Sequence, residues 1–241
     1  MKLSIIRKPR FRLNRWLPLA VGVLLVTITA QAQRITSGHL NVGALGTNTG
    51  SQLTFANGAA FVLTSGYVQM ELATSGTYAG YYGSGPSVTA LPQTVAHGGP
   101  NPMAPSLGSF VEVNMTLHAA PEGGVFSFWN TGSLVPTFSL DTVGEVSPLW
   151  NLSGGEENPT AGSSGADPYG HIHGRRFTAT LPGEYIIGFQ AFDTSPNGAQ
   201  HAPSSPLEIR FMAVPEPSTL ALLLLGGTLA GGWVIKRRRI Q

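Results

Sequence analysis

Apolar positions in the middle of the chain fall into short runs, and in several runs they alternate with polar positions. The runs read HLNVGAL, SQLTFAN, AAFVLT, SFVEVNMTLHA, GGVFSFWN, FTAT and YIIGFQAFD. Alternation with a period of two is typical of half-buried β-strands, and turn-forming residues such as Gly, Pro and Asn bound the runs. No long segment has apolar residues at helical spacing. The pattern therefore predicts an all-β fold, with a single antiparallel β-sandwich-like domain over residues 33–213.

A longer apolar run, WLPLAVGVLLVTITA, lies near the N-terminus. Six basic residues precede it, and its last residue, Ala30, begins the small-x-small triplet Ala30-Gln31-Ala32. This order is that of a secretory signal peptide, so we expect signal peptidase to remove residues 1–32. The alternative is an uncleaved anchor, which the shortness of the apolar run disfavours.

A second apolar run, Thr219 to Ile235, lies near the C-terminus and is followed by Lys236, Arg237, Arg238 and Arg239. At about 1.5 Å of rise per helical residue it would extend roughly 25 Å, barely enough to cross a hydrocarbon core. Basic residues beside a span stay in the cytoplasm. The run therefore predicts a transmembrane helix over residues 219–235 with a cytoplasmic basic tail.

The triplet Pro215-Glu216-Pro217, the apolar span and the basic tail occur in that order over residues 214–241. This segment resembles the PEP-CTERM sorting signal of Gram-negative, biofilm-forming bacteria. The resemblance implies that an exosortase recognises and cleaves the signal. It also implies a precursor held transiently in the inner membrane, whose product goes to the periplasm, the cell surface or the extracellular matrix. It implies nothing about what the exported domain does.

The formal net charge of +2 hides an acidic domain. Six of the 14 basic residues lie in the signal peptide and four in the tail, which leaves four, whereas 11 of the 12 acidic residues lie between residues 33 and 214. The exported segment therefore carries a net charge of −7. It has no basic face to neutralise phosphates, so a nucleic-acid partner is excluded, and it suits cations instead. The chain has no cysteine, so a soft-metal site must use His, Asp or Glu.

Two of the six histidines, His171 and His173, are one residue apart. On a strand they would share one face, with side chains roughly 6 to 7 Å apart, close enough to bind one ion from both rings. The residues after them predict a strand at 177–180, a Pro-Gly turn at 181–184 and a strand at 185–192. We therefore expect the pair to begin a rigid hairpin and to form half of a metal site. The alternative is two polar strand residues that face solvent.

Other side chains are candidates to complete such a site. Asp167 precedes the pair by four residues, and His39 and His201 lie where a strand or a loop begins. His118 is expected at a strand end and His97 in a loop. Three or four imidazoles would bind zinc tetrahedrally, although copper and nickel accept the same nitrogen ligands.

The segment PYGHIHGRRFTATLPGEYIIGF resembles the His-x-His…Phe-Thr…Pro-Gly-x-Tyr signature of bacterial surface-anchored domains. These include actinobacterial wall-associated repeats and a PEP-CTERM family linked to zinc-uptake-regulator repression. Asn41 stands where the former have an acid, and Arg176 where they favour Trp, which indicates the PEP-CTERM branch. The resemblance implies an exported zinc-binding protein in zinc homeostasis. The implied ligands are His171, His173, His39 and His201.

The sequence also bears on two other classes of function. The chain has neither a Gly-x-Ser-x-Gly elbow nor a His-Glu-x-x-His helix, and Glu156 and Glu157 are adjacent in a glycine-rich loop. We therefore expect no enzyme; a metal-dependent hydrolase is the less favoured possibility. The main alternative to zinc binding is a structural component of the biofilm or exopolysaccharide matrix, without a metal.

Tyrosines and arginines bear on the matrix alternative. Tyr78, Tyr81 and Tyr82 lie between glycines, where they would either stack on sugar rings or plug a surface loop. Arg175 and Arg176 are expected to pair with Asp193 or Glu184, or to contact an anionic polysaccharide.

Overall fold

The computed structural model describes residues 33–46, 48–85, 87–91, 103–153 and 175–215. Within these ranges nearly all regular structure is β, which confirms the all-β prediction. The elements are β1 (Gln33–Ile35), β2 (His39–Ala44), β3 (Leu53–Phe55), the 3-10 turn η1 (Gly58–Ala60), β4 (Gly66–Leu72), β5 (Tyr82–Ser84), β6 (Ser87–Ala90), β7 (Val111–Ala119), β8 (Phe126–Trp129), β9 (Phe138–Leu140), β10 (Trp150–Asn151), β11 (Arg176–Ala179), β12 (Gly183–Asp193) and β13 (Leu207–Val214).

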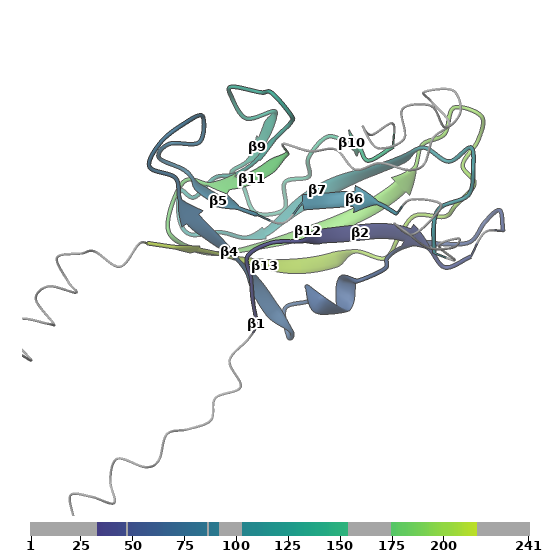
Figure 1. Ribbon diagram of the computed structural model, residues 1–241, viewed down its shortest axis with the longest axis horizontal. Coiled ribbons are helices and arrows are strands. Elements are labelled where there is room, and N and C mark those ends of the chain that lie inside the picture. Colours follow the sequence, from purple (N-terminus) through teal and green to yellow (C-terminus); the bar gives the residue numbers. More distant parts are fainter. Residues whose placement is uncertain (1–32, 47, 86, 92–102, 154–174, 216–241) are drawn as a thin grey trace, which may run out of the picture. The chain divides into compact units, whose positions relative to one another are not determined.

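Most of these strands form one large sheet that curls on itself (Figure 1). The order across it is β10-β7-β12-β13-β4-β5-β11-β8-β9, and β1 also pairs with β4. A small second sheet has the order β3-β2-β6. Strand β4 joins the two halves of the large sheet, because β13 and β5 both pair with it.

The strand pairs are mostly antiparallel, as expected, but β1–β4, β13–β4 and β2–β6 are parallel. Parallel neighbours cannot be joined by a tight turn, so each pair brings together segments that are far apart in the chain. The alternation of apolar residues reveals each strand but not its partner. The parallel pairs are therefore a result of the tertiary structure.

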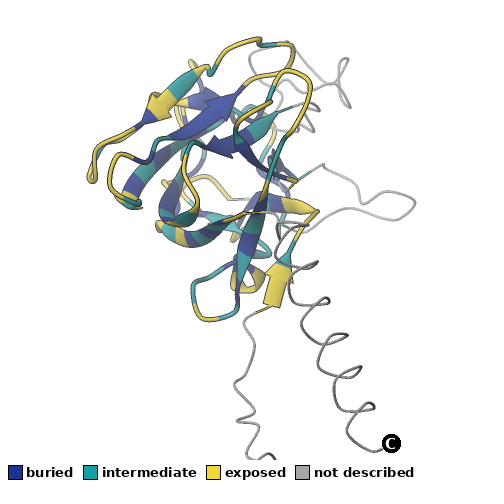
Figure 2. Ribbon diagram, turned by 90° about the vertical axis from the view of Figure 1, so that its left-hand side faces the viewer, coloured by how far each residue is buried: buried dark blue, intermediate teal, exposed yellow. Residues whose placement is uncertain are grey.

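Strand β7 shows how the alternation builds the core. Its Val111, Val113, Met115 and Leu117 are fully buried, while the residues between them are only half-buried. Rings from the two halves of the curled sheet meet in the same interior: Phe177 lies 5.7 Å from Phe189, measured between ring centroids. Burial of these faces against each other gives a sandwich-like body, with its buried residues inside (Figure 2).

The small sheet covers part of this core. Leu40 of β2 and Val88 of β6 line one small cavity together with Phe177, Phe189 and Phe211 of the large sheet. Both aliphatic side chains are buried. The β2 strand that begins at His39 is thus packed firmly on the main body.

The predicted hairpin over residues 177–192 is wrong in its pairing, although both strands exist. Strand β11 pairs with β5 and β8, whereas β12 pairs with β7 and β13. The connecting turn carries the chain from one half of the curled sheet to the other. Pro182 restricts its φ to about −65°, but tight two-residue hairpins need a positive φ at the first central position. The Pro-Gly turn therefore directs the chain away from hairpin pairing.

Candidate functional site

The predicted metal pair, His171 and His173, lies outside the described residues, as do Asp167 and His97. The described chain resumes at Arg175, directly before β11. The structural information nearest to the pair is therefore the set of contacts that hold Arg175 and the start of β11.

Arg175 is fixed by three hydrogen bonds and two rings. Its Nε donates to Asn130 Oδ1 at 2.9 Å, its Nη2 donates to Asn151 Oδ1 at 2.9 Å, and its Nη1 donates to the Asn151 carbonyl. The guanidinium carbon lies 5.8 Å from the Phe128 ring centroid and 5.6 Å from that of Trp150. Desolvation by burial lowers the pKa of Arg175 to about 10. Arg175 thus stays charged at neutral pH and ties β11 to β8 and β10.

Arg176 faces the opposite side of β11, toward the outer aromatic cluster, a name we give to Tyr78, Tyr81 and Trp129. Both tyrosines meet the indole edge to face, at 5.1 and 5.4 Å. The Arg176 guanidinium lies over Tyr78 at 5.0 Å, and its buried Nε has no hydrogen-bond partner. Trp129 donates from Nε1 to Thr178 Oγ1 at 2.7 Å, which holds the indole in place.

The tyrosines of the glycine-rich segment were expected either to stack on sugar rings or to plug a surface loop. Tyr78 and Tyr81 are half-buried against Trp129, and Tyr82 is buried in the main core. Tyr78 and Tyr81 thus plug the loop between β4 and β5 against Trp129, whereas Tyr82 is the first residue of β5.

The predicted ion pairs between the arginines and Asp193 or Glu184 are wrong. Asp193 instead accepts hydrogen bonds from the backbone N–H groups of four residues at 2.7 to 3.1 Å; the donors are Phe110, Ser195, Gln200 and His201. Glu184 pairs with Arg210 at 2.9 Å. Both carboxylates lie on β12, which does not pair with β11, and this separates them from Arg175 and Arg176.

His201 is buried, with 3 % of its surface exposed. Its Nε2 accepts a hydrogen bond from the Ser106 N–H at 2.9 Å, so Nε2 carries no proton there. Its Nδ1 lies 2.9 Å from the Ser51 hydroxyl and 3.1 Å from the Ser51 carbonyl, to which it donates. Both ring nitrogens are thus engaged in joining three loops, and a metal there would displace at least one of these bonds.

His39 lies at the other end of the small sheet. His39 is exposed at the first position of β2. At the last position of β2, Ala44 pairs with Leu53, and Ser51, two residues before Leu53, contacts His201. Six strand residues extend roughly 17 Å, so one ion cannot bind both histidines. In the ranges the structure describes, no three His, Asp or Glu side chains gather closely enough for a metal. His39 and His201 therefore cannot both belong to one site with His171 and His173, which lie outside the described residues.

Several residues of the surface-domain signature have structural tasks. Phe177 is in the core, and Gly183 adopts a positive φ of 132° that other residues rarely adopt. The Tyr185 hydroxyl donates to the Leu181 carbonyl at 3.1 Å and closes the turn. Desolvation is the main cause that raises the pKa of Tyr185. The Phe-Thr…Pro-Gly-x-Tyr part of the signature thus builds the β11–β12 connection.

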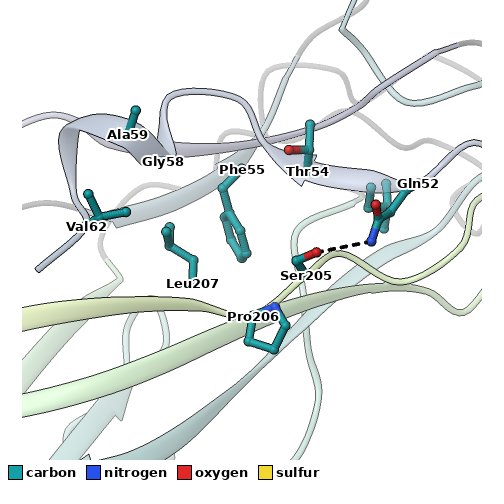
Figure 3. A pocket seen from close by; sticks show the side chains of 10 residues that line it. Gln52, Thr54, Phe55, Gly58, Ala59, Val62, Ser205, Pro206 and Leu207 are labelled. Carbon is teal, nitrogen blue, oxygen red and sulfur yellow. Dashed lines mark hydrogen bonds between the residues drawn. The ribbon is translucent and has the colours of Figure 1, made fainter.

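A pocket of about 190 Å³ lies between β3, η1 and the start of β13 (Figure 3). Phe55 and Leu207 point into it, and Gln52 donates to Ser205 at 3.4 Å at its rim. None of its lining residues is acidic, basic or a histidine. It is also smaller than the roughly 300 to 1,000 Å³ of typical ligand pockets.

Arg175 and Asp193 were expected only as ion-pair partners, and their observed hydrogen bonds to Asn130, Asn151 and backbone N–H groups were not predicted. A local signal existed for Asp193, because Asp followed by Thr-Ser-Pro is typical of a turn in which the carboxylate accepts the N–H two residues on. That bond is present, from Ser195 at 3.1 Å. No local signal marks Arg175, since its partners are 24 and 45 residues away.

The C-terminal segment matches a known family. The model of the PEP-CTERM protein-sorting motif matches residues 213–239, which include Pro215, Glu216 and Pro217. No curated protein and no solved structure matches the chain. Among the described residues no helix is long and apolar enough to span a membrane, and the predicted signal peptide and span lie outside them. The chain is therefore an exported protein that carries a PEP-CTERM sorting motif, made as a membrane-anchored precursor and processed by an exosortase on its way to the cell surface.

Proposed function

We propose that the exported domain binds zinc at the cell surface, with His171 and His173 as the first two ligands, and serves zinc homeostasis without catalysing a reaction. The observation that supports this best is the anchoring of Arg175. The residue two positions after His173 is held by three hydrogen bonds and two rings. A ligand pair that adjoins a fixed backbone loses less conformational entropy when it binds an ion.

The remaining ligands follow from the positions of the candidates. His201 has both ring nitrogens in hydrogen bonds, so it is the least suited. Asp167 is close in sequence to the pair, and His39 is exposed. We assign the third ligand to one of these two, and the acidic domain supports the binding of a divalent cation.

Zinc titration by calorimetry tests this proposal. The domain over residues 33–214 should bind one zinc ion, and a His171→Ala/His173→Ala variant should lose binding at least roughly 100-fold. Affinity should fall as the pH drops below about 6.5, because protonated imidazole cannot bind metal. Asp167→Asn and His39→Ala identify the third ligand. His118→Ala, at an exposed strand position, is the matched control, and equal heats for the double variant and the wild type would refute the site.

A second function, a matrix component that binds anionic polysaccharide, is favoured by Arg176. No carboxylate of the described residues pairs with this guanidinium, which Tyr78 and Gly83 hold in place. A fixed guanidinium suits a sugar carboxylate, which it can bind through two hydrogen bonds.

Gel electrophoresis with embedded polysaccharide separates this function from the first. Polygalacturonate should retard the domain more than neutral dextran does, and the difference should shrink with salt and in Arg176→Gln. Arg34→Gln removes the same charge from an exposed position of β1. Retardation that is equal for Arg176→Gln and the wild type would contradict binding at this residue.

A further inference from the structure

The sorting motif begins inside the folded domain. Its match starts at residue 213, while β13 continues to Val214. Ala213 pairs with Gly183 of β12 and Met70 of β4, and Val214 pairs with Glu71 of β4. Pro215 follows directly and is exposed. No spacer therefore separates the last paired residue from the triplet that the exosortase recognises.

The end of β13 is held on both sides. Strand β13 lies between β12 and β4, and β4 in turn pairs with β5 at Glu71 and Leu72. Ala213 has 2 % of its surface exposed. This is an interior strand of the large sheet, not an edge strand whose last residues fray easily. Opening it breaks backbone hydrogen bonds and exposes apolar surface.

Only a short length of chain separates the end of β13 from the triplet and from the expected membrane span. The stretch from Val214 to Pro217 reaches at most roughly 10 Å when fully extended, and that from Val214 to Thr219, where the expected span begins, at most roughly 18 Å. A domain of this size has a radius of gyration of about 16 Å. The length of the chain alone therefore keeps the triplet within roughly 10 Å of the paired end of β13.

Enzymes that act on a peptide bond commonly bind the peptide as an extended strand, through its backbone N–H and C=O groups. In Ala213 and Val214, which precede the triplet, these groups already pair β13 with its neighbours β12 and β4. We propose that the end of β13 limits the access of the exosortase, so that processing requires Ala213 and Val214 to leave the sheet. Docking of β13 and processing then compete for the same backbone, and the domain surface around Val214 is where the enzyme meets its substrate.

A reversible lock tests this in the full chain, in a host that contains an exosortase. The chain has no cysteine, so Glu71→Cys with Val214→Cys creates a unique pair. These residues are direct partners on adjacent strands and both are exposed. Neighbouring strands lie about 4.8 Å apart, within the range of Cα separations that a disulfide accepts. In a pulse-chase experiment the oxidised form should be processed roughly tenfold more slowly or worse, and a reductant should restore the rate.

A second variant keeps the proposal testable if the disulfide fails to form. Six Gly-Ser residues inserted between Val214 and Pro215 should speed processing several-fold, because they supply a free strand without opening the sheet. The same insert between Gly132 and Ser133, in the exposed β8–β9 connection, is the matched control. Equal processing of the oxidised and reduced double-cysteine chain, or a linker variant no faster than the wild type, would overturn the proposal. Absence of processing in the wild type and the linker variant alike would overturn it too.

Discussion

Replacing Asp193 by alanine is expected to destabilise the exported domain by about 3 to 5 kcal/mol. The buried carboxylate accepts four backbone N–H groups, from Phe110 and from the turn over residues 195–201. Alanine leaves these donors without their acceptor, and a buried N–H without a partner costs about 1 to 3 kcal/mol. Urea unfolding followed by the fluorescence of Trp129 and Trp150 measures the change.

Two variants show whether the acceptor geometry is responsible. Asp193→Asn preserves size and keeps one oxygen as the acceptor for two of the donors, but it turns an NH₂ toward the other two, so it should still be strongly destabilising. Asp141→Asn, at an exposed carboxylate whose Oδ1 accepts only a Thr142 hydroxyl, should change stability by less than about 1 kcal/mol. If the two asparagine variants were equally stable, the network around Asp193 would not carry the stability assigned to it.

Replacing Arg175 by alanine is expected to cost about 2 to 4 kcal/mol and to weaken zinc binding as well. The change removes three hydrogen bonds and the contact with Phe128 and Trp150. Strand β11 then loses its link to β8 and β10, and the His171–His173 segment loses its fixed neighbour. Unfolding in urea and calorimetric zinc titration report the two effects.

Arg175→Met separates packing from hydrogen bonding. Methionine retains an apolar stem against the rings but donates no hydrogen bond, so the loss should be roughly half that of alanine. Arg175→Lys keeps a charge but cannot reproduce the planar fork, so it should resemble methionine. Zinc affinity that is unchanged in Arg175→Ala would show that the histidine pair does not depend on this anchor.

The candidate site was only partly predictable, and the β11–β12 connection shows why. Residues 177–192 contain clear signals for two strands and a turn, and all three exist. The pairing of the strands depends on the apolar side chains that Phe177 and Phe189 contact in the core. These side chains come from remote parts of the chain. The hairpin prediction failed at this point because periodicity describes a strand's faces and not its edges.

The same limit applies to polar side chains. The pair His171 and His173 stands out because two candidate ligands are one residue apart in the sequence. The hydrogen bonds of His201, in contrast, go to Ser51 and Ser106, which are 150 and 95 residues away. A buried histidine with both nitrogens satisfied and a metal ligand look alike in a sequence. Only the partners distinguish them.

The sequence by itself determined the β class, the acidic character of the domain and the sorting motif, because local composition, alternation and short motifs carry each of these. The tertiary structure decided that β13 is an interior strand ending at the motif, that Asp193 gathers backbone donors, and that His39 and His201 lie apart. These depend on strand pairing, which is selected by the packing of the whole core and by hydrogen bonds between distant segments.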